Sequence, residues 1–171
     1  WKWRNVGLIA QMAYEWSQRT GDMRKLQWES IDFDLGVLNL EQSKRRVDVE
    51  IPISENLMSM LKVQHQDFGF QKYVAPSLKP LNGSYKPYHI SQVSHIANSV
   101  KATCGLPSEL HVMDMRRTAI TQMVEAGVDI TQIMAVSGHQ NVQSVSPYIK
   151  HTLAASTKAT EKRNIYLDTK K

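Results

Sequence analysis

The chain has 171 residues, a length typical of one domain or of one domain with a tail. Hydrophobic residues make up 42% and charged residues 22%, so a sizeable core is possible and the composition argues against wholesale disorder. The net charge of +5 favours an anionic partner, nucleic acid first, although many other proteins reach this balance. Cys104 is the single cysteine, which excludes an intrachain disulfide and a multi-cysteine zinc site and favours a reducing compartment.

The ends of the sequence carry no targeting signal that we can identify. No apolar run approaches the roughly 18 residues that a membrane-spanning helix needs, and no signal peptide is visible. The sequence opens at Trp1 without a methionine, so we expect a fragment or a trimmed form of a longer chain. Because no apolar run is long enough to span a bilayer, we expect no membrane association.

The first predicted elements are two helices and a sheet. Apolar residues recur at helical spacing over residues 5–17, which predicts an amphipathic helix. Asp22 can accept hydrogen bonds from free N–H groups, which predicts a short second helix beginning there. Between residues 31 and 53 the apolar period changes to two, which predicts three antiparallel strands with one buried face. Lys44 lies at the predicted turn between the last two strands.

The second half of the chain is predicted to be helical around one long loop. Ser54 is predicted to cap a helix, and residues 69–87 hold enough proline and glycine to predict the loop. Three further helices are predicted, from Ile90 to Val100, from Val112 to Met123 and, after the capping residue Asp129, over Ile130–Val136. Ser146, followed by a proline, predicts a helix start that would place Tyr148 in the opening turn. The tail 158–171 is basic and weakly patterned.

These elements predict a mostly helical α+β domain with one small three-stranded antiparallel sheet. Strands and helices do not alternate, so a parallel nucleotide-binding sheet is not supported. A Gly-rich phosphate loop, an H-E-x-x-H motif, a G-x-S-x-G motif and a D-x-D-x-D-G loop are all absent from the sequence. What remains is a set of basic residues and one tyrosine, each at a loop or a helix start.

Two segments of the first half resemble known motifs. Residues 18–22 (Gln-Arg-Thr-Gly-Asp), with Leu-Gln-Trp at 26–28 and Ile-Asp at 31–32, resemble the first arginine box of the tyrosine recombinases, the phage integrase family. Lys44 lies seven residues before Ile51, as does the β-hairpin lysine of that family.

Two further boxes follow in the second half. Residues 114–118 (Asp-Met-Arg-Arg-Thr) resemble the family's second box, usually H-x-L-R-x-T, and Glu-Ala-Gly-Val at 125–128 follows as in the family. Residues 137–139 (Ser-Gly-His) resemble the L-G-H box, and Tyr148 falls nine residues after His139, where the family keeps its nucleophile. Each box alone is weak, but four in the right order and spacing make a specific match over about residues 8–151.

The resemblance implies the catalytic domain of a site-specific DNA recombinase. Arg19 and Arg116 would clamp the scissile phosphate, because guanidinium groups are permanently charged and donate hydrogen bonds in pairs. Tyr148 would attack the phosphorus and form a 3′-phosphotyrosyl link, while Lys44 would protonate the leaving 5′ oxygen. His139 would donate to a phosphate oxygen. The resemblance also implies Asp22 as a brace for the Arg19 region.

One departure from the family pattern matters for activity. The histidine that the family places three residues before the second arginine falls on Met113, which cannot transfer a proton. On a helix start, His111 would point about 200° away from position 113. We expect an active natural variant, with compensation by another group or a debilitated enzyme as the alternatives. A smaller departure is Pro147, which would stiffen the approach to the nucleophile.

Ordinary structural roles compete with these assignments. Arg19 could cap the end of the preceding helix, and Arg116 could pair with a surface carboxylate such as Asp114 or Glu125. A basic run at a hairpin tip is usually a solvated turn or a general DNA contact, and we expect Arg45 and Arg46 to act as phosphate neighbours of Lys44. Arg117 serves as an internal control, expected to be solvated or to contact the DNA backbone.

The resemblance also implies partners and boundaries. We expect double-stranded DNA as substrate, a homotetramer on paired sites, possible accessory DNA-bending proteins, and neither a metal nor a nucleotide cofactor. Residues 1–152 would form the N-terminally truncated catalytic domain, and residues 153–171 a tail exchanged between protomers, in the cytoplasm of a bacterial host. The alternative function is a catalytically silent DNA-binding or regulatory module on the same fold, with Met113 as the sign of decay.

Overall fold

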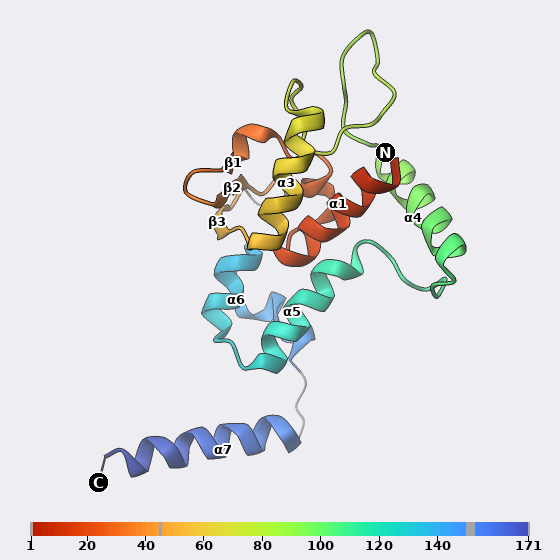
Figure 1. Ribbon diagram of the computed structural model, residues 1–171. Helices are drawn as coiled ribbons and strands as arrows, with labels where there is room; N and C mark the ends of the chain where they lie inside the picture. The colour runs from red at the N-terminus through yellow and green to blue at the C-terminus, as the bar shows by residue number, and fades with distance from the viewer. Residues whose placement is uncertain (1, 45, 150–152, 171) are drawn as a thin grey trace.

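The computed structural model describes residues 2–44, 46–149 and 153–170 (Figure 1). These residues form seven α-helices, three β-strands and three short 3₁₀ helices. In chain order they are α1 (Lys2–Glu15), α2 (Thr20–Met23), η1 (Trp28–Ser30), β1 (Ile31–Asp32), β2 (Val37–Glu41), β3 (Asp48–Pro52), α3 (Glu55–Phe68), α4 (Ile90–Cys104), α5 (Asp114–Ala126), α6 (Ile130–Ser137), η2 (Val142–Ser144), η3 (Ser146–Tyr148) and α7 (Leu153–Asp168). The predicted mostly helical α+β fold is confirmed.

The sheet pairs its strands antiparallel in the order β1, β2, β3. Leu38 of β2 lies opposite both Ile31 and Ile51, and all three side chains are buried. Asn39 and Glu50 pair on the other face and are exposed, because successive side chains of a strand point to opposite faces. The predicted sheet, with one face in the core and one in water, is therefore confirmed.

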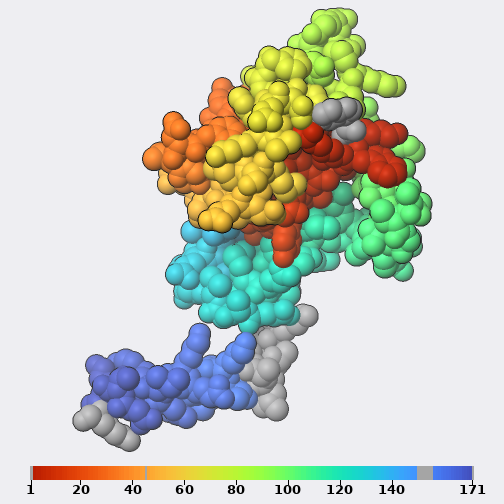
Figure 2. Space-filling model, in the orientation of Figure 1, coloured from red at the N-terminus to blue at the C-terminus, as the bar shows by residue number. Residues whose placement is uncertain are grey.

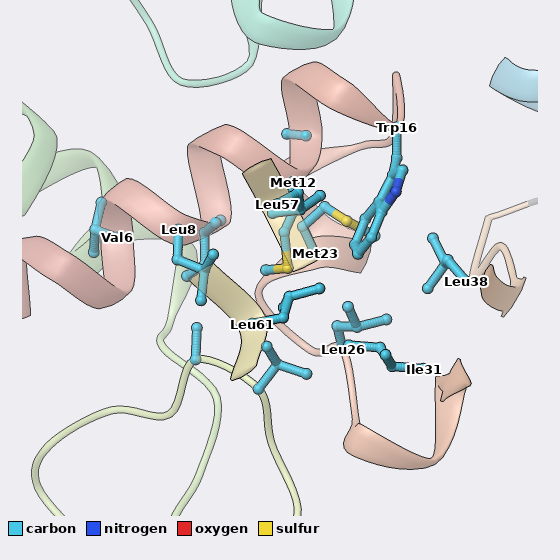
Figure 3. Close-up of a cluster of buried hydrophobic side chains, with 14 of the residues drawn as sticks. Val6, Leu8, Met12, Trp16, Met23, Leu26, Ile31, Leu38, Leu57 and Leu61 are labelled. Carbon is cyan, nitrogen blue, oxygen red and sulfur yellow. The ribbon is translucent and has the colours of Figure 1, made fainter. Parts of the chain in front are cut away.

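The main core forms where α1, α2, the sheet and α3 meet (Figure 3). Met12 near the carboxyl end of α1 and Trp16 directly after the helix are buried together with Leu57 and Leu61 of α3. Ser54 begins α3 as predicted, since its hydroxyl accepts a hydrogen bond from the backbone N–H of Leu57 at 3.1 Å. This packing fixes the end of α1 and the start of α2, from which the first arginine box projects.

A second, smaller core supports the carboxyl half of the fold. It consists of Ile120 from α5, Ile133 from α6 and Val145 between η2 and η3, all fully or almost fully buried. Tyr148 packs against this cluster. Because α5 also packs against α1, the two cores are joined and bring the boxes of both chain halves close together (Figure 1).

Two predicted helix starts are wrong in detail. Asp22 does not begin α2, because the N-cap position is taken by Arg19 and Asp22 lies inside the helix, where its buried carboxylate accepts hydrogen bonds from Ser43. Ser146 is the first residue of η3 rather than its N-cap, and η3 has only three residues. A 3₁₀ turn satisfies few hydrogen bonds, so Tyr148 depends on packing for its position.

Helix α7 is an element that the sequence pattern did not predict. It stands apart from the rest of the molecule in Figures 1 and 2, and its residues from 156 onward are exposed. The ammonium of Lys158 returns to the body, where it donates to the backbone carbonyl of Glu125 at 3.1 Å. The domain boundary predicted after residue 152 lies outside the described residues. Within the described chain, neither α7 nor any other helix combines the length and apolar character of a bilayer span.

Candidate active site

A cleft of about 690 Å³ opens between α2, α4, the segment before α5 and the end of α6. Arg19, Arg116, His139 and Tyr148 all line this cleft, although they come from distant parts of the chain. The two arginine boxes, the Ser-Gly-His box and the tyrosine therefore meet at one place. Among the described residues, no three His, Cys, Asp or Glu side chains are arranged to share a metal ion.

Arg19 reaches the cleft from the turn between α1 and α2. Its extended backbone, with φ −70° and ψ 137°, makes it the N-cap residue of α2. One guanidinium nitrogen donates to the side-chain oxygen of Gln42 at 2.9 Å and lies 3.9 Å from the carboxylate of Asp22. These contacts direct the side chain across the fold, toward the end of β2, so they favour the site interpretation over a cap on α1.

Asp22 connects the arginine to the β2–β3 turn. Its carboxylate is 5% exposed and accepts hydrogen bonds from both the backbone N–H and the hydroxyl of Ser43. Ser43 directly precedes Lys44, so this carboxylate anchors the base of the turn that carries the lysine. The position of Asp22 fits the bracing role that the resemblance implies.

Arg116 projects from α5 into the same cleft. It is 9% exposed, and its Nη2 donates to the backbone carbonyl of Ser137 at 2.9 Å and lies 3.3 Å from Nε2 of His139. A buried guanidinium needs such acceptors because the charge has lost its water. The next residue, Arg117, is exposed and is not among the described residues that line the cleft.

The hydrogen bonds of His139 fix the orientation of its ring. The hydroxyl of Ser137 donates its one proton to the carbonyl of Ile133 at 2.6 Å, so it must accept from Nδ1 of His139 at 2.7 Å. A guanidinium can only donate, so Nε2 of His139 accepts from Arg116. In this arrangement Nδ1 faces an acceptor and Nε2 faces a donor, so the contacts orient the ring with Nε2 toward Arg116.

Tyr148 lies beside His139 on the η3 turn. The two ring centroids are 6.3 Å apart, and the phenol ring is partly buried against the second core. The backbone N–H of Tyr148 donates to the carbonyl of Val145 at 2.9 Å, and Pro147 lies in the same turn. The η3 turn and the packing of the ring against the second core together hold the tyrosine at the cleft.

Met113 and His111 both line the cleft. Met113 is 71% exposed, and it precedes α5, which begins at Asp114. His111 lies two residues further outside the helix, where its backbone N–H donates to the Asp114 carboxylate at 2.9 Å. The expected rotation of about 200° assumed that both positions lie on the helix, whereas α5 begins at Asp114 and both residues line the same cleft.

The turn between β2 and β3 carries the basic residues. Lys44 and Arg46 are exposed, and neither is among the described residues that line the cleft, while Arg45 lies outside the described residues. The turn closes through the Arg46 N–H, which donates to the Gln42 carbonyl at 2.8 Å, with Arg46 at φ 49°. This left-handed conformation is uncommon for a residue with a side chain.

Three residues of the site received no functional role from the sequence motifs. Gln18, Gln42 and Ser137 are all fully buried, and each hydrogen bonds to a cleft residue or to the other glutamine. Gln42 directly follows β2, and the alternation of that strand places it on the same face as Leu38 and Leu40. That period was the signal that could have found it.

Helix α6 presents the Ser137–His139 segment to the cleft. Asp129 begins the helix as predicted, with its carboxylate accepting from the backbone N–H of Thr131 at 2.8 Å. Hydrogen bonds from the hydroxyl and then the backbone of Thr131 lower the pKa of the Asp129 carboxyl. Gly138 ends the helix at φ 69°, a left-handed conformation that favours glycine.

The family comparison covers most of this chain. The model of the phage integrase family matches residues 4–154. A tyrosine recombinase of Pseudothermotoga lettingae is 23% identical over 146 residues, which cover 83% of this chain and 48% of that protein. The shufflon-specific DNA recombinase of Escherichia coli is 25% identical over 142 residues, which cover 82% of this chain and 33% of that protein. The chain thus spans about half or less of these two relatives.

Solved structures show the same fold. The crystal structure of XerA recombinase superposes with a TM-score of 0.68 at 15% identity, covering 93% of this chain and 61% of XerA. XerH site-specific recombinase, bound to its difH substrate, superposes with a TM-score of 0.70 at 14% identity, covering 92% of this chain and 46% of XerH. Since the family model extends over nearly the whole chain and the four boxes meet in one cleft, this chain belongs to the phage integrase family of tyrosine recombinases.

Proposed function

We propose that this chain is the catalytic part of a site-specific DNA recombinase that cuts and rejoins strands through a phosphotyrosyl link at Tyr148. The observation that carries the proposal is the cleft itself, which collects Arg19, Arg116, His139 and Tyr148. Two guanidinium groups and a phenol around one cavity suit an anionic phosphodiester. Preorganised donors of this kind usually provide the largest catalytic contribution.

The proposed cleavage step exchanges one phosphorus–oxygen bond for another. Tyr148 attacks the phosphorus, a bond forms to its phenolic oxygen, and the bond to the 5′ oxygen of the leaving strand breaks. The phenol releases its proton to solvent water as it attacks, and Lys44 supplies a proton to the 5′ oxygen. Because the phosphotyrosyl link retains the phosphodiester's energy, the 5′ hydroxyl of another strand can reverse the step without a nucleotide.

Lys44 must approach the cleft for this step. It is exposed at the β2–β3 turn, while the preceding Ser43 is anchored to Asp22. We propose that the turn folds over the bound DNA with this anchor as its base, and that Arg45 and Arg46 hold adjacent phosphates. On the other side of the cleft, a protonated His139 would donate to a phosphate oxygen once the anion separates it from Arg116.

Met113 favours one alternative, a catalytically silent DNA-binding module. The thioether stands where the family carries a proton-transferring histidine. We favour the active enzyme because loss of one acid–base group costs on the order of 10² to 10⁴ in rate, which need not abolish the chemistry. The imidazole of His111 lines the same cleft and offers a titratable group for compensation.

Covalent trapping tests the proposed function. The complete product of the gene that encodes this chain is incubated with a library of nicked duplexes of randomised core sequence, and adducts that resist denaturation are collected. We expect a DNA-linked band that Tyr148→Phe removes, with Tyr85→Phe as the matched control that keeps it. DNA binding without any band would support the silent module.

The partners are proposals of the same kind. XerH is described as bound to its difH substrate and lambda integrase as a dimer bound to a COC′ core site. We propose that this chain also binds double-stranded DNA, as a homotetramer on paired sites within a bacterial cytoplasm, with accessory DNA-bending proteins. Residues 153–171 would be exchanged between protomers, which suits a helix α7 whose Ile165, Tyr166 and Leu167 are exposed.

A further inference from the structure

Two buried glutamines connect the arginine boxes behind the cleft. Gln18 and Gln42 are both 0% exposed, and the Gln42 amide nitrogen donates to the Gln18 side-chain oxygen at 2.6 Å. Gln18 itself donates to the carbonyls of Trp16 at 2.8 Å and Val136 at 2.7 Å. The pair therefore joins the end of α1, the end of β2 and the carboxyl end of α6.

Gln42 occupies the central position of this network. Its oxygen accepts from Arg19 at 2.9 Å, and its nitrogen donates to the carbonyl of Ser137 at 2.9 Å. The same Ser137 carbonyl accepts from Arg116, also at 2.9 Å. The two guanidinium groups are thus linked through one amide and one carbonyl, which sets their separation.

The contacts require an amide at this position and determine its orientation. The nitrogen of Gln42 faces two oxygen acceptors, from Gln18 and Ser137, and its oxygen faces a guanidinium that can only donate. A rotated amide would place like groups against each other at all three contacts. A hydrophobic side chain would satisfy none of them, and a glutamate would set a negative charge against Arg19.

We infer that Gln42 is a positioning residue that holds the Arg19 guanidinium opposite Arg116 by a neutral acceptor. Neutrality matters because the arginine keeps its full positive charge for an incoming phosphate, whereas a carboxylate in contact would compete with that phosphate. The charged Asp22 lies farther from the guanidinium, at 3.9 Å. The inference rests on the proposed function, in which the two arginines bind the scissile phosphate.

The first test measures how fast the complete gene product forms covalent adducts with nicked duplex DNA. Gln42→Met removes the amide at similar volume, and we expect adduct formation at saturating DNA to slow by about 10- to 100-fold, because small misplacements of a catalytic group have effects of this size. DNA affinity should change less than threefold. The control is Gln64→Met, since Gln64 is also 0% exposed and donates to Asn5 and Val74, each at 2.9 Å. Equal cleavage rates in the two variants would overturn the inference.

The second test does not depend on cleavage. Inorganic phosphate is titrated into the protein while the side-chain Nε–H resonance of Arg19 is followed by NMR. Gln42→Met and Gln42→Glu should both shift this resonance and weaken phosphate binding at least fivefold, whereas Gln64→Met should do neither. Unchanged phosphate binding in both Gln42 variants would overturn the inference. A wild-type protein that binds phosphate through Arg19 yet forms no adduct would instead refute the proposed function alone.

Discussion

Gly138→Ala gives a quantitative test of the buried network, because this glycine has two independent reasons to lack a side chain. A Cβ at position 138 would lie 2.3 Å from the side-chain nitrogen of Gln42 and 2.5 Å from its Cδ. The residue also adopts φ 69°, a conformation that costs a non-glycine residue about 1 kcal/mol. The substitution therefore combines a steric clash with backbone strain.

The clash has a large effect because the Gln42 amide cannot move aside without losing its partners. It makes hydrogen bonds with Arg19, Gln18 and Ser137, each contributing about 1 kcal/mol net to stability. Losing two or three of them in addition to the strain predicts that Gly138→Ala lowers the free energy of unfolding by about 3 to 4 kcal/mol. Urea unfolding followed by tryptophan fluorescence measures this change, since Trp16 is buried in the main core.

Two comparisons separate the clash from the strain. Gly105 ends α4 at φ 64° with nothing within 4 Å of a Cβ, so Gly105→Ala should cost only about 1 kcal/mol. In a Gln42→Ala background, where the obstructing amide is gone, Gly138→Ala should also cost about 1 kcal/mol. If the costs of Gly138→Ala and Gln42→Ala simply add, the amide does not press on this glycine and the reasoning fails.

Four further changes test other parts of the site. Met113→His places an imidazole at an exposed position. The rate of adduct formation should stay within twofold of the wild type, or rise by up to about 10²-fold where proton transfer limits the rate. A tenfold loss would show that the methionine belongs to a repacked site. Arg46→Gly removes the backbone strain of the left-handed conformation at φ 49° and should raise the free energy of unfolding by about 0.5 to 1 kcal/mol. The salt dependence of DNA binding should fall by about one released ion. A loss of stability would contradict the turn geometry. Arg117→Gln should reduce the same salt dependence without slowing cleavage at saturating DNA more than threefold, and a slowing as large as that of Arg116→Gln would place it in the clamp. Because the pKa of Asp129 is lowered, its capping of α6 is present at neutral pH and is lost as the pH falls through that pKa. Between neutral pH and about pH 3, Asp129→Asn should therefore lose less stability than the wild type in urea unfolding. An equal loss in the two proteins would contradict the capping.

The parts of the fold that the sequence predicts well are those with strong local patterns. Strand alternation predicted the sheet, and capping residues such as Ser54 and Asp129 predicted helix starts. Helix α7 escaped because its apolar residues Ile165, Tyr166 and Leu167 are consecutive and therefore spread around the helix, which leaves no amphipathic period.

The site was predictable where chemistry repeats in a motif and hidden where it depends on tertiary contacts. Arg19, Arg116, His139 and Tyr148 could be named from spacing, and the structure brings them together. The role of Gln42 depends on the carboxyl end of α6, which no local pattern connects to the β2–β3 turn. The course of the chain at His111 likewise depended on where α5 begins, a boundary that varies by a residue or two in any sequence-based assignment.

The most direct test of the central claim is to identify the residue that carries the DNA. Adducts trapped on nicked duplexes are digested with nuclease and trypsin, and the remaining peptides are analysed by mass spectrometry. The account predicts a nucleotide attached to the phenolic oxygen of Tyr148, in the peptide that also contains His139. A nucleotide on any of the other five tyrosines of the chain, or on a serine or a lysine, would contradict it.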